Sequence, residues 1–280
     1  MINKVLYLGP QGSYSEIAKE RFIQYFSSNC EFTPIDSIYK IMQALKRINS
    51  ENLAAVIPIE NSIEGVVRET QDCLTSLAEK GYRIQGETDL SIEHALISYG
   101  EKSQITVIKS HPQALAQCRE YIYRNWNDKI TLTPVLSTSS AVSSLSQNDK
   151  TIAAIGNQYC ASLYNTPILD YKINDEDNNT TRFILLSKIK PIKTNSNKVS
   201  ISFSTENKAG ALNKVLTTLE KYGLNMSYID SRPSRKELGE YVFYIDFAGY
   251  IEDTNVNMAL IEIQAYVKMF EILSEGAEVL

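Results

Sequence analysis

Short apolar runs alternate with stretches of helical periodicity along the first two-thirds of the chain, and this alternation constrains the fold more than any other feature. The runs have five to seven residues, end at polar or turn residues, and lie at residues 4–8, 53–59, 105–110, 151–156 and 182–187. Helical patterns at residues 15–26 and 112–125 follow the first and third runs, and the second pattern opens on a proline. Such alternation predicts an α/β fold with largely parallel sheets.

The pattern changes after residues 188–197, which are polar, contain a proline and lack periodicity. The C-terminal stretch beyond them predicts a strand, a helix, two strands, a second helix and a short tail, with the five elements at residues 199–204, 208–223, 226–231, 241–247 and 255–270. We interpret this order as the β-α-β-β-α-β unit of ferredoxin-like folds. We therefore expect an α/β region at 1–188, a linker at 189–197 and a ferredoxin-like unit at 198–280.

Composition excludes several classes of protein. With 43% hydrophobic and 22% charged residues among 280, the chain has enough apolar material for a sizeable core. A net charge of -5 argues against nucleic acid as the main partner. No apolar run approaches the roughly 20 residues that span a bilayer, and the N-terminus lacks the features of a signal peptide. We expect a cytoplasmic protein that binds no membrane.

Histidine and cysteine are scarce, which limits the chemistry. The four cysteines are scattered and form no CxxC pair, and the two histidines are His94 and His111. This argues against a zinc site, a disulfide framework, a His-rich metal centre and a Ser-His-Asp triad, so we expect no metal.

Polar residues come directly after the first two apolar runs, at the strand ends where open α/β sheets bind ligands. In GPQGSYSE, Ser13 and Ser15 stand at a helix entry, which suits a carboxylate or phosphate, although this segment alone favours a simple turn with a serine N-cap. The segment is no P-loop, because a GK[ST] ending is missing. In PIENSIEG, Glu60 and Asn61 follow a buried strand and either bind a polar ligand group or sit solvated at the strand end.

A third segment, SHPQALAQC, also places polar residues directly at the end of an apolar run. In it, Ser110 and His111 precede a helix on which Gln113 and Gln117 share a face; the alternative is a capped helix with solvated glutamines.

In NTTRF, Arg182 suits a bidentate contact with a substrate carboxylate and Thr181 offers a hydroxyl beside it. The alternative is a structural salt bridge at Arg182. In the C-terminal unit, AGAL opens a helix and DSRP ends a strand, which on their own indicate a generic regulatory or interaction module.

Taken in order, these segments resemble the monofunctional bacterial prephenate dehydratases that carry a C-terminal ACT domain. The resemblance covers nearly the whole chain and rests on GPQGSYSE, VIPIENSIEGVVRETQD, SHPQALAQC, AAIGNQYCASLY, NTTRF, AGAL and DSRP. It implies two catalytic α/β lobes like those of type 2 periplasmic binding proteins, with the active site in the cleft between them. It also implies conversion of prephenate to phenylpyruvate, water and carbon dioxide in phenylalanine biosynthesis, without a cofactor.

The resemblance assigns roles to individual residues. The implied catalytic residues are Thr181, Glu60, Asn61, Ser110 and Gln117, and the implied substrate-binding residues are Arg182, Ser13, Ser15, His111 and Gln113. Phenylalanine is the implied feedback inhibitor, bound by Gly210, Ala211, Leu212, Asp230, Ser231, Arg232 and Pro233. Family members form dimers or tetramers joined partly through their ACT domains.

The sequence departs from the family pattern in places. The first motif reads GSYSE instead of GTFSE, and Gln71 stands where the family has leucine. Ala209 replaces a proline before the ACT helix, and Asp230 replaces a glutamate. The last two changes bear on inhibitor potency rather than on catalysis.

Three questions stay open at this point. The proton for the departing hydroxyl comes either from a protonated Glu60 or through a relay at Thr181. The substrate is prephenate or its amino analogue arogenate, and a non-catalytic amino-acid sensor is the alternative from another class. Because the first motif begins at Gly9, we expect no N-terminal chorismate mutase unit.

Overall fold

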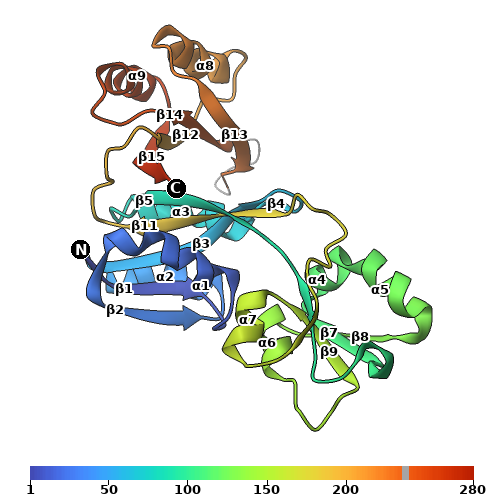
Figure 1. Cartoon of the computed structure of the whole chain (residues 1–280). Coiled ribbons are helices and arrows are strands. Elements are labelled where there is room, and N and C mark those ends of the chain that lie inside the picture. Colours follow the sequence, from blue (N-terminus) through green and yellow to red (C-terminus); the bar gives the residue numbers. More distant parts are fainter. Residues whose placement is uncertain (235–239) are drawn as a thin grey trace.

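The computed structural model describes residues 1–234 and 240–280 and divides into two lobes and a C-terminal unit (Figure 1). The first lobe combines a sheet with four helical segments. Its strands are β1 (Ile2–Leu8), β2 (Phe26–Ile35), β3 (Leu53–Asn61), β4 (Gly65–Val66), β5 (Arg83–Ser91) and β11 (Thr180–Ser187). Its helices are α1 (Tyr14–Lys19), η1 (Glu20–Tyr25), α2 (Ile38–Ile48) and α3 (Arg68–Ala78).

The second lobe is inserted between β5 and β11. Its strands are β6 (Ala95–Ile97), β7 (Val107–Ser110), β8 (Thr131–Pro134), β9 (Ile152–Gly156) and β10 (Ile168–Asp170). Its helices are η2 (Lys102–Gln104), α4 (Pro112–Gln117), α5 (Arg119–Trp126), η3 (Asn127–Lys129), α6 (Thr138–Ser143) and α7 (Gln158–Leu163). In the described residues, its sheet has the order β10-β6-β9-β7-β8.

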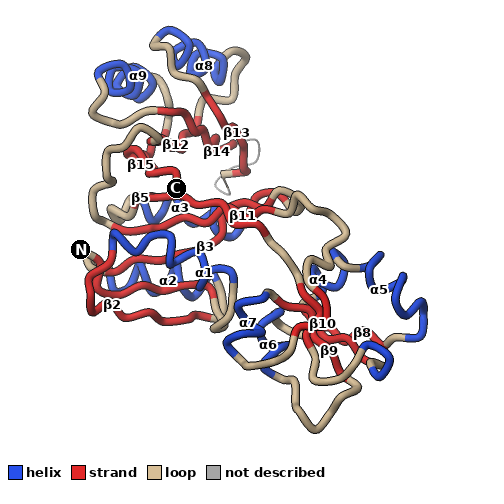
Figure 2. Tube along the Cα trace, viewed as in Figure 1, coloured by secondary structure: helices blue, strands red, loops and turns tan. Residues whose placement is uncertain are grey.

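The C-terminal unit forms an antiparallel sheet with both of its helices on one face (Figure 2). It contains β12 (Asn197–Ser204), α8 (Ala211–Lys221), β13 (Met226–Pro233), β14 (Tyr241–Ala248), α9 (Thr254–Gln264) and β15 (Met269–Val279). The strand order β13-β14-β12-β15 is that of a ferredoxin-like unit, as predicted. The expected second helix, residues 255–270, overran its true end, because β15 begins at Met269 and takes up the predicted tail.

The C-terminal sheet is continuous with the sheet of the first lobe, because β15 pairs with β5 in parallel. Among the described residues, the joined sheet runs in the order β13-β14-β12-β15-β5-β11-β3-β1-β2, with β4 paired to β3. One face of the first-lobe part packs against α2, α3 and the C-terminal unit, and α1 and η1 cover the other face. The α/β class is confirmed, but the sheets are mixed rather than largely parallel, since β11 runs antiparallel to both β3 and β5.

Three local predictions were wrong for identifiable reasons. The helix expected at residues 15–26 is broken by non-helical backbone at Phe22, and Phe26 already opens β2. β2 was missed because it is a polar strand at the sheet edge with alternating exposure. The helix expected at residues 112–125 is two helices, α4 and α5, separated at Cys118. The domain limits at 188 and 198 remain a prediction; β11 ends at Ser187 and β12 begins at Asn197.

We predict that Gly276→Ala destabilises the protein by about 3 kcal/mol, because Gly276 has φ +133° and an added Cβ would lie 2.5 Å from the Tyr250 ring. Gly223→Ala is the matched control. Its φ is +68°, no atom lies within 4 Å of the added Cβ, and the expected loss is about 1 kcal/mol. Urea unfolding of both variants checks this. Equal losses would contradict the proposed clash with Tyr250.

Candidate active site

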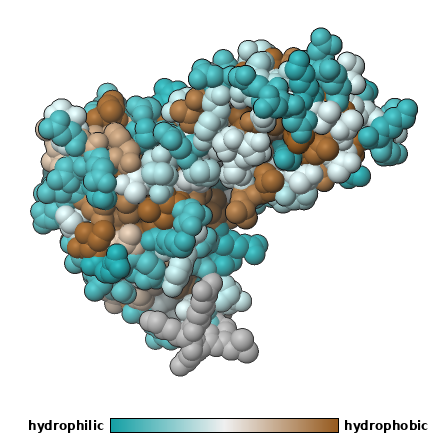
Figure 3. Space-filling view, turned by 90° about the horizontal axis from the view of Figure 1, so that it is seen from below, coloured by the Kyte–Doolittle hydropathy of each residue, from teal (hydrophilic) through white to brown (hydrophobic). Residues whose placement is uncertain are grey.

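A cleft of about 650 Å³ lies between the two lobes. In the space-filling view from below, the surface is hollowed where the lobes meet, and apolar side chains gather around the hollow (Figure 3). The volume is typical of a small-molecule site. Of the residues predicted from sequence, those lining the cleft are Ser13, Ser15, Asn61, His111, Gln113, Gln117 and Thr181.

A chain of hydrogen bonds between side-chain amides ties the two lobes together at the cleft. Asn61 Nδ2 lies 2.8 Å from Asn179 Oδ1 and 2.8 Å from Thr181 Oγ. Asn179 Nδ2 in turn donates to Gln117 Oε1 at 3.0 Å, and His94 Nε2 lies 3.0 Å from the same oxygen. The chain runs from lobe 1 to lobe 2 and orders the polar groups around Thr181.

The hydrogen bonds of Asn61 fix which atom of its amide faces Thr181. Its Oδ1 accepts from the backbone N–H groups of Ile63 and Glu64, both at 3.0 Å, so its Nδ2 must point toward Thr181. An amide N–H only donates, and Thr181 Oγ is therefore the acceptor in that bond. The hydroxyl proton of Thr181 remains available to a molecule in the cleft.

Gln117 is oriented in the same way. Its Oε1 accepts from both His94 and Asn179, which leaves its Nε2 amide group as a donor to the cleft. His94 donates through Nε2, so its Nδ1 carries the lone pair. That Nδ1 is buried and has no hydrogen-bond partner among residues 1–234 and 240–280. Burial lowers the pKa of His94, and its hydrogen bond to Gln117 partly opposes this effect.

His94 and Asn179 were not among the predicted site residues. Both lie where the chain crosses between the lobes: Ile92 N–H donates to Asn179 O at 2.7 Å, and Ile173 N–H donates to His94 O at 2.9 Å. Asn179 stands two residues before Thr181 in a segment already selected from sequence, so its position was a usable signal. His94 gave no signal beyond being one of two histidines.

Four helices begin at the cleft, and their N-cap residues all line it. Ser13, Ser37, His111 and Ser137 cap α1, α2, α4 and α6, each accepting one backbone N–H. The other unpaired N–H groups of these first turns make the cleft favourable for anions. Within the described part of the chain, the lining contains no lysine or arginine, and its carboxylates, Asp36, Glu64 and Glu69, are exposed.

Glu60 and Arg182 do not line the cleft, which corrects two predictions. Arg182 follows Thr181 on β11, so its side chain points to the opposite face of the sheet. On β3, a bulge at Ile59 shifts the register: Phe183 pairs with Pro58, but Arg182 pairs with Glu60 and Thr181 with Asn61. The bulge reverses the alternation along β3 and sends Glu60 away from the cleft, where it binds Arg182 at 3.1 Å.

Ser110 is also placed outside the cleft lining. It is fully buried, and its hydroxyl donates to the Ile155 carbonyl at 2.7 Å, which ties β7 to β9. Ser13 lines the cleft, but its hydroxyl already donates to the Leu8 carbonyl at 2.7 Å. Both serines therefore hold the backbone around the cleft.

The residues expected to bind phenylalanine lie at two places in the C-terminal unit. Gly210 caps α8 with a positive φ of 81°, and Ala211 and Leu212 begin that helix. On β13, Arg232 contacts Asp72 of α3 at 3.2 Å, and Asp230 lies on the same side of the strand. Ser231 and Pro233 alternate with them on the other side, so the four residues of DSRP do not share one face.

The fold and the cleft define a two-lobed α/β domain with a polar site between the lobes, joined to a C-terminal ferredoxin-like unit. The prephenate dehydratase family model matches residues 5–191, and the ACT domain model matches residues 199–263. The chain belongs to the prephenate dehydratase family and carries an ACT domain.

Individual relatives agree with this assignment. The chain is 44% identical to the prephenate dehydratase of Methanocaldococcus jannaschii, over 88% of this chain and 89% of that protein. It is 32% identical to the bifunctional chorismate mutase/prephenate dehydratase of Aquifex aeolicus, over 96% of this chain and 72% of that protein. The structure of the Arthrobacter aurescens prephenate dehydratase in complex with L-Phe superposes with a TM-score of 0.84 at 28% identity, covering 98% of this chain and 89% of that one.

We predict that His94 makes the folded protein sensitive to acid. Its lowered pKa means that the unfolded chain binds a proton near pH 6.5 while the folded protein does not, so stability falls as the pH drops below that value. His94→Gln has no titrating ring. The stability advantage of the wild type over this variant should shrink between pH 7.5 and pH 5.5 in urea unfolding. A difference that does not change with pH would contradict the prediction.

Proposed function

We propose that this protein converts prephenate to phenylpyruvate, water and carbon dioxide, as a carbon–oxygen lyase of phenylalanine biosynthesis. The observation that carries the proposal is the Thr181 hydroxyl, held by Asn61 at 2.8 Å with its own proton free toward the cleft. Membership of the prephenate dehydratase family supports the choice of substrate.

The reaction requires the protein mainly to orient the substrate and to donate hydrogen bonds to it. The bond from the ring to its carboxylate breaks, and those electrons move through the ring as carbon dioxide leaves. The C–O bond at the opposite ring carbon breaks at the other end of the electron flow, and hydroxide departs. Formation of the aromatic ring drives the change, so the main requirement is a donor placed at the departing oxygen.

Thr181 fills that requirement in our proposal. Because Asn61 donates to Oγ, the Thr181 O–H is directed away from Asn61 and donates to the departing hydroxyl. A threonine hydroxyl is too weak an acid to lose its proton outright, so the proton that converts hydroxide to water comes ultimately from solvent. Glu60 is no longer a candidate source, since its carboxylate lies on the other face of the sheet with Arg182.

The two substrate carboxylates are held without a cationic side chain in this proposal. The helix starts around Ser37 and His111 supply N–H donors, and His111 Nδ1 accepts from Gln113 N–H at 3.3 Å, which leaves its Nε2–H as a further donor. The Gln117 amide adds another neutral donor. Neutral donors bind the ring carboxylate without the strong ion pair that would oppose its loss as carbon dioxide.

Phenylalanine is proposed as the feedback inhibitor, bound at the ACT domain near Gly210 and Ser231. We also propose a homodimer or homotetramer assembled through ACT domains; Ile229 on the edge strand β13 is 42% exposed, which suits a subunit contact there. None of the helices in residues 1–234 and 240–280 is both long and apolar enough to cross a bilayer. A cytoplasmic location is part of the proposal.

We predict that Thr181→Val lowers turnover of prephenate by about 100- to 1000-fold, the usual cost of removing one donor from such a site. Thr181→Ser keeps the hydroxyl and is expected to stay within about tenfold of the wild type. Phenylpyruvate absorbance measures the rate, with arogenate assayed beside prephenate to compare the two substrates. Near wild-type turnover by folded Thr181→Val would contradict the role, and wild-type protein inactive on both substrates would favour an amino-acid sensor.

A further inference from the structure

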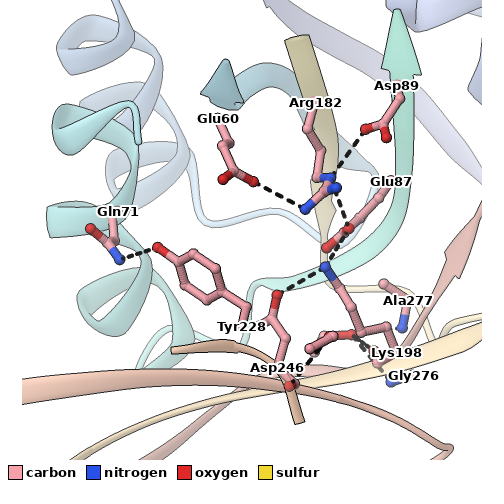
Figure 4. A network of polar contacts seen from close by, with 12 residues as sticks. Glu60, Gln71, Glu87, Asp89, Arg182, Lys198, Tyr228, Asp246, Gly276 and Ala277 are labelled. Carbon is pink, nitrogen blue, oxygen red and sulfur yellow. Dashed lines mark hydrogen bonds and ion pairs between the residues drawn. The ribbon is translucent and has the colours of Figure 1, made fainter. Parts of the chain in front are cut away.

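Six charged side chains form a network between the first lobe and the ACT domain, on the side of the sheet away from the cleft (Figure 4). They are four carboxylates and two cations, and we call them the interdomain ion network: Glu60, Glu87, Asp89, Arg182, Lys198 and Asp246. The first four come from β3, β5 and β11 of the catalytic lobe, and the last two come from β12 and β14 of the ACT domain. The proposed chemistry uses none of them.

Glu87 contacts the cations of both domains. Its carboxylate lies 2.5 Å from Lys198 Nζ and 3.8 Å from Arg182 Nε, and its side chain is only 4% exposed. Lys198 also contacts Asp246 at 2.9 Å. Buried ion pairs are little screened by salt, and removing one partner leaves the other charge uncompensated. Because Lys198 belongs to the ACT domain, movement of that domain changes the ion pair at Glu87 directly.

The backbone reinforces this link. β15 of the ACT domain meets β5 at only two register pairs, and one of these joins Val279 to Glu87 itself. The N–H of Leu280 also donates to the Glu87 carbonyl at 2.9 Å. A shift of the ACT sheet thus displaces Glu87 through its main chain as well as through Lys198.

On the catalytic side, the network ends beside the proposed reaction centre. Arg182 donates to Glu60 at 3.1 Å, and the next pair in the same ladder is Thr181 with Asn61. Arg182 and Thr181 are neighbours on β11 with side chains on opposite faces. Tilting this part of β11 by a pull on Arg182 moves the Thr181 hydroxyl on the other side.

The interdomain ion network also has the space and the carboxylates for a second set of ion pairs. Arg182 donates to Asp89 at 3.1 Å as well as to Glu60, so it can shift its pairing without losing a carboxylate partner. A cavity of about 310 Å³, lined by all six members, lies between the two domains. Discrete alternative pairings of this kind are what allow an interface to switch between states.

We propose that the interdomain ion network transmits phenylalanine binding from the ACT domain to Thr181, with Arg182 and Glu60 as positioning residues. The inference rests on the proposed function, in which phenylalanine inhibits the dehydratase. The alternative is a network that only holds the domains together, which would affect stability without changing the response to phenylalanine.

The test uses the full chain with Lys198→Met, which cuts the ACT side of the network. Turnover of prephenate without phenylalanine should stay within about threefold of the wild type. The phenylalanine concentration for half-inhibition should rise at least about tenfold, within the usual five- to 150-fold range of allosteric coupling. Calorimetry should still detect phenylalanine binding. Lys193→Met is the control, since its pair with Asp253 is exposed and lies outside the network, and its inhibition should match the wild type.

Lys198→Met leaves Glu87 with one cation fewer, so Glu87→Gln/Lys198→Met is the second variant, expected to fold and to resist inhibition in the same way. An unchanged inhibition curve in a folded variant would overturn the proposal. Loss of phenylalanine binding would also overturn it, because Lys198 would then belong to the ligand site. If the wild-type protein turns over prephenate and is not inhibited by phenylalanine, the proposed inhibition is wrong. The network would then have no phenylalanine signal to transmit.

Discussion

The arrangement of the two lobes and the core of the first lobe depends on β11, which pairs with β3 on one side and β5 on the other. This strand returns from the second lobe into the middle of the first-lobe sheet, so it closes the crossing between the lobes and completes the core on both faces. Its two faces have separate duties. Thr181 points into the cleft between the lobes, and Arg182 points to the junction with the ACT domain. In our proposal, the chemistry and its regulation therefore meet at two consecutive residues.

The two faces of β11 also differ in the charge of the side chains that surround them. On the cleft side the polar groups around Thr181 are neutral amides and hydroxyls that bond to one another, with Asn61, Asn179 and Thr181 all at most 9% exposed. Such groups can face a substrate at little desolvation cost. On the other side the groups are charged, and three of them, Glu87, Lys198 and Asp246, are largely shielded from water, so a mismatch among these three is expensive. In our proposal, this arrangement lets the ACT domain act on the site without placing a cationic side chain beside the substrate.

Apolar runs and helical periodicity in the sequence predicted the strands and helices that form from contiguous residues. The buried strands β1, β3, β9 and β11 were found because their apolar runs are short and continuous, whereas the buried strand β5 was not predicted because most of its residues are polar. The ferredoxin-like unit was found because its strands and helices follow one another. Arg182 was expected at the cleft wrongly because consecutive residues on a strand point to opposite faces of the sheet. Glu60 was expected there wrongly because its face depends on a bulge at Ile59, whose partner strand lies about 120 residues further along the chain. His94 was missed for a similar reason, since its role comes from Gln117 and from the crossing between the lobes rather than from its neighbours. Family motifs placed Thr181, Asn61 and Gln117 at the cleft, but they could not show which residues in each motif turn away from it.

The most direct test measures the coupling between prephenate and phenylalanine in a Thr181→Val protein, in which turnover is slow enough for prephenate to stay saturating during a titration. Calorimetric titration of phenylalanine with and without saturating prephenate gives the coupling as a ratio of affinities, and this ratio is reciprocal between the two ligands. Our account predicts that prephenate weakens phenylalanine binding by about tenfold, and that adding Arg182→Gln to the same protein removes the effect. Coupling of equal size with and without Arg182 would contradict it.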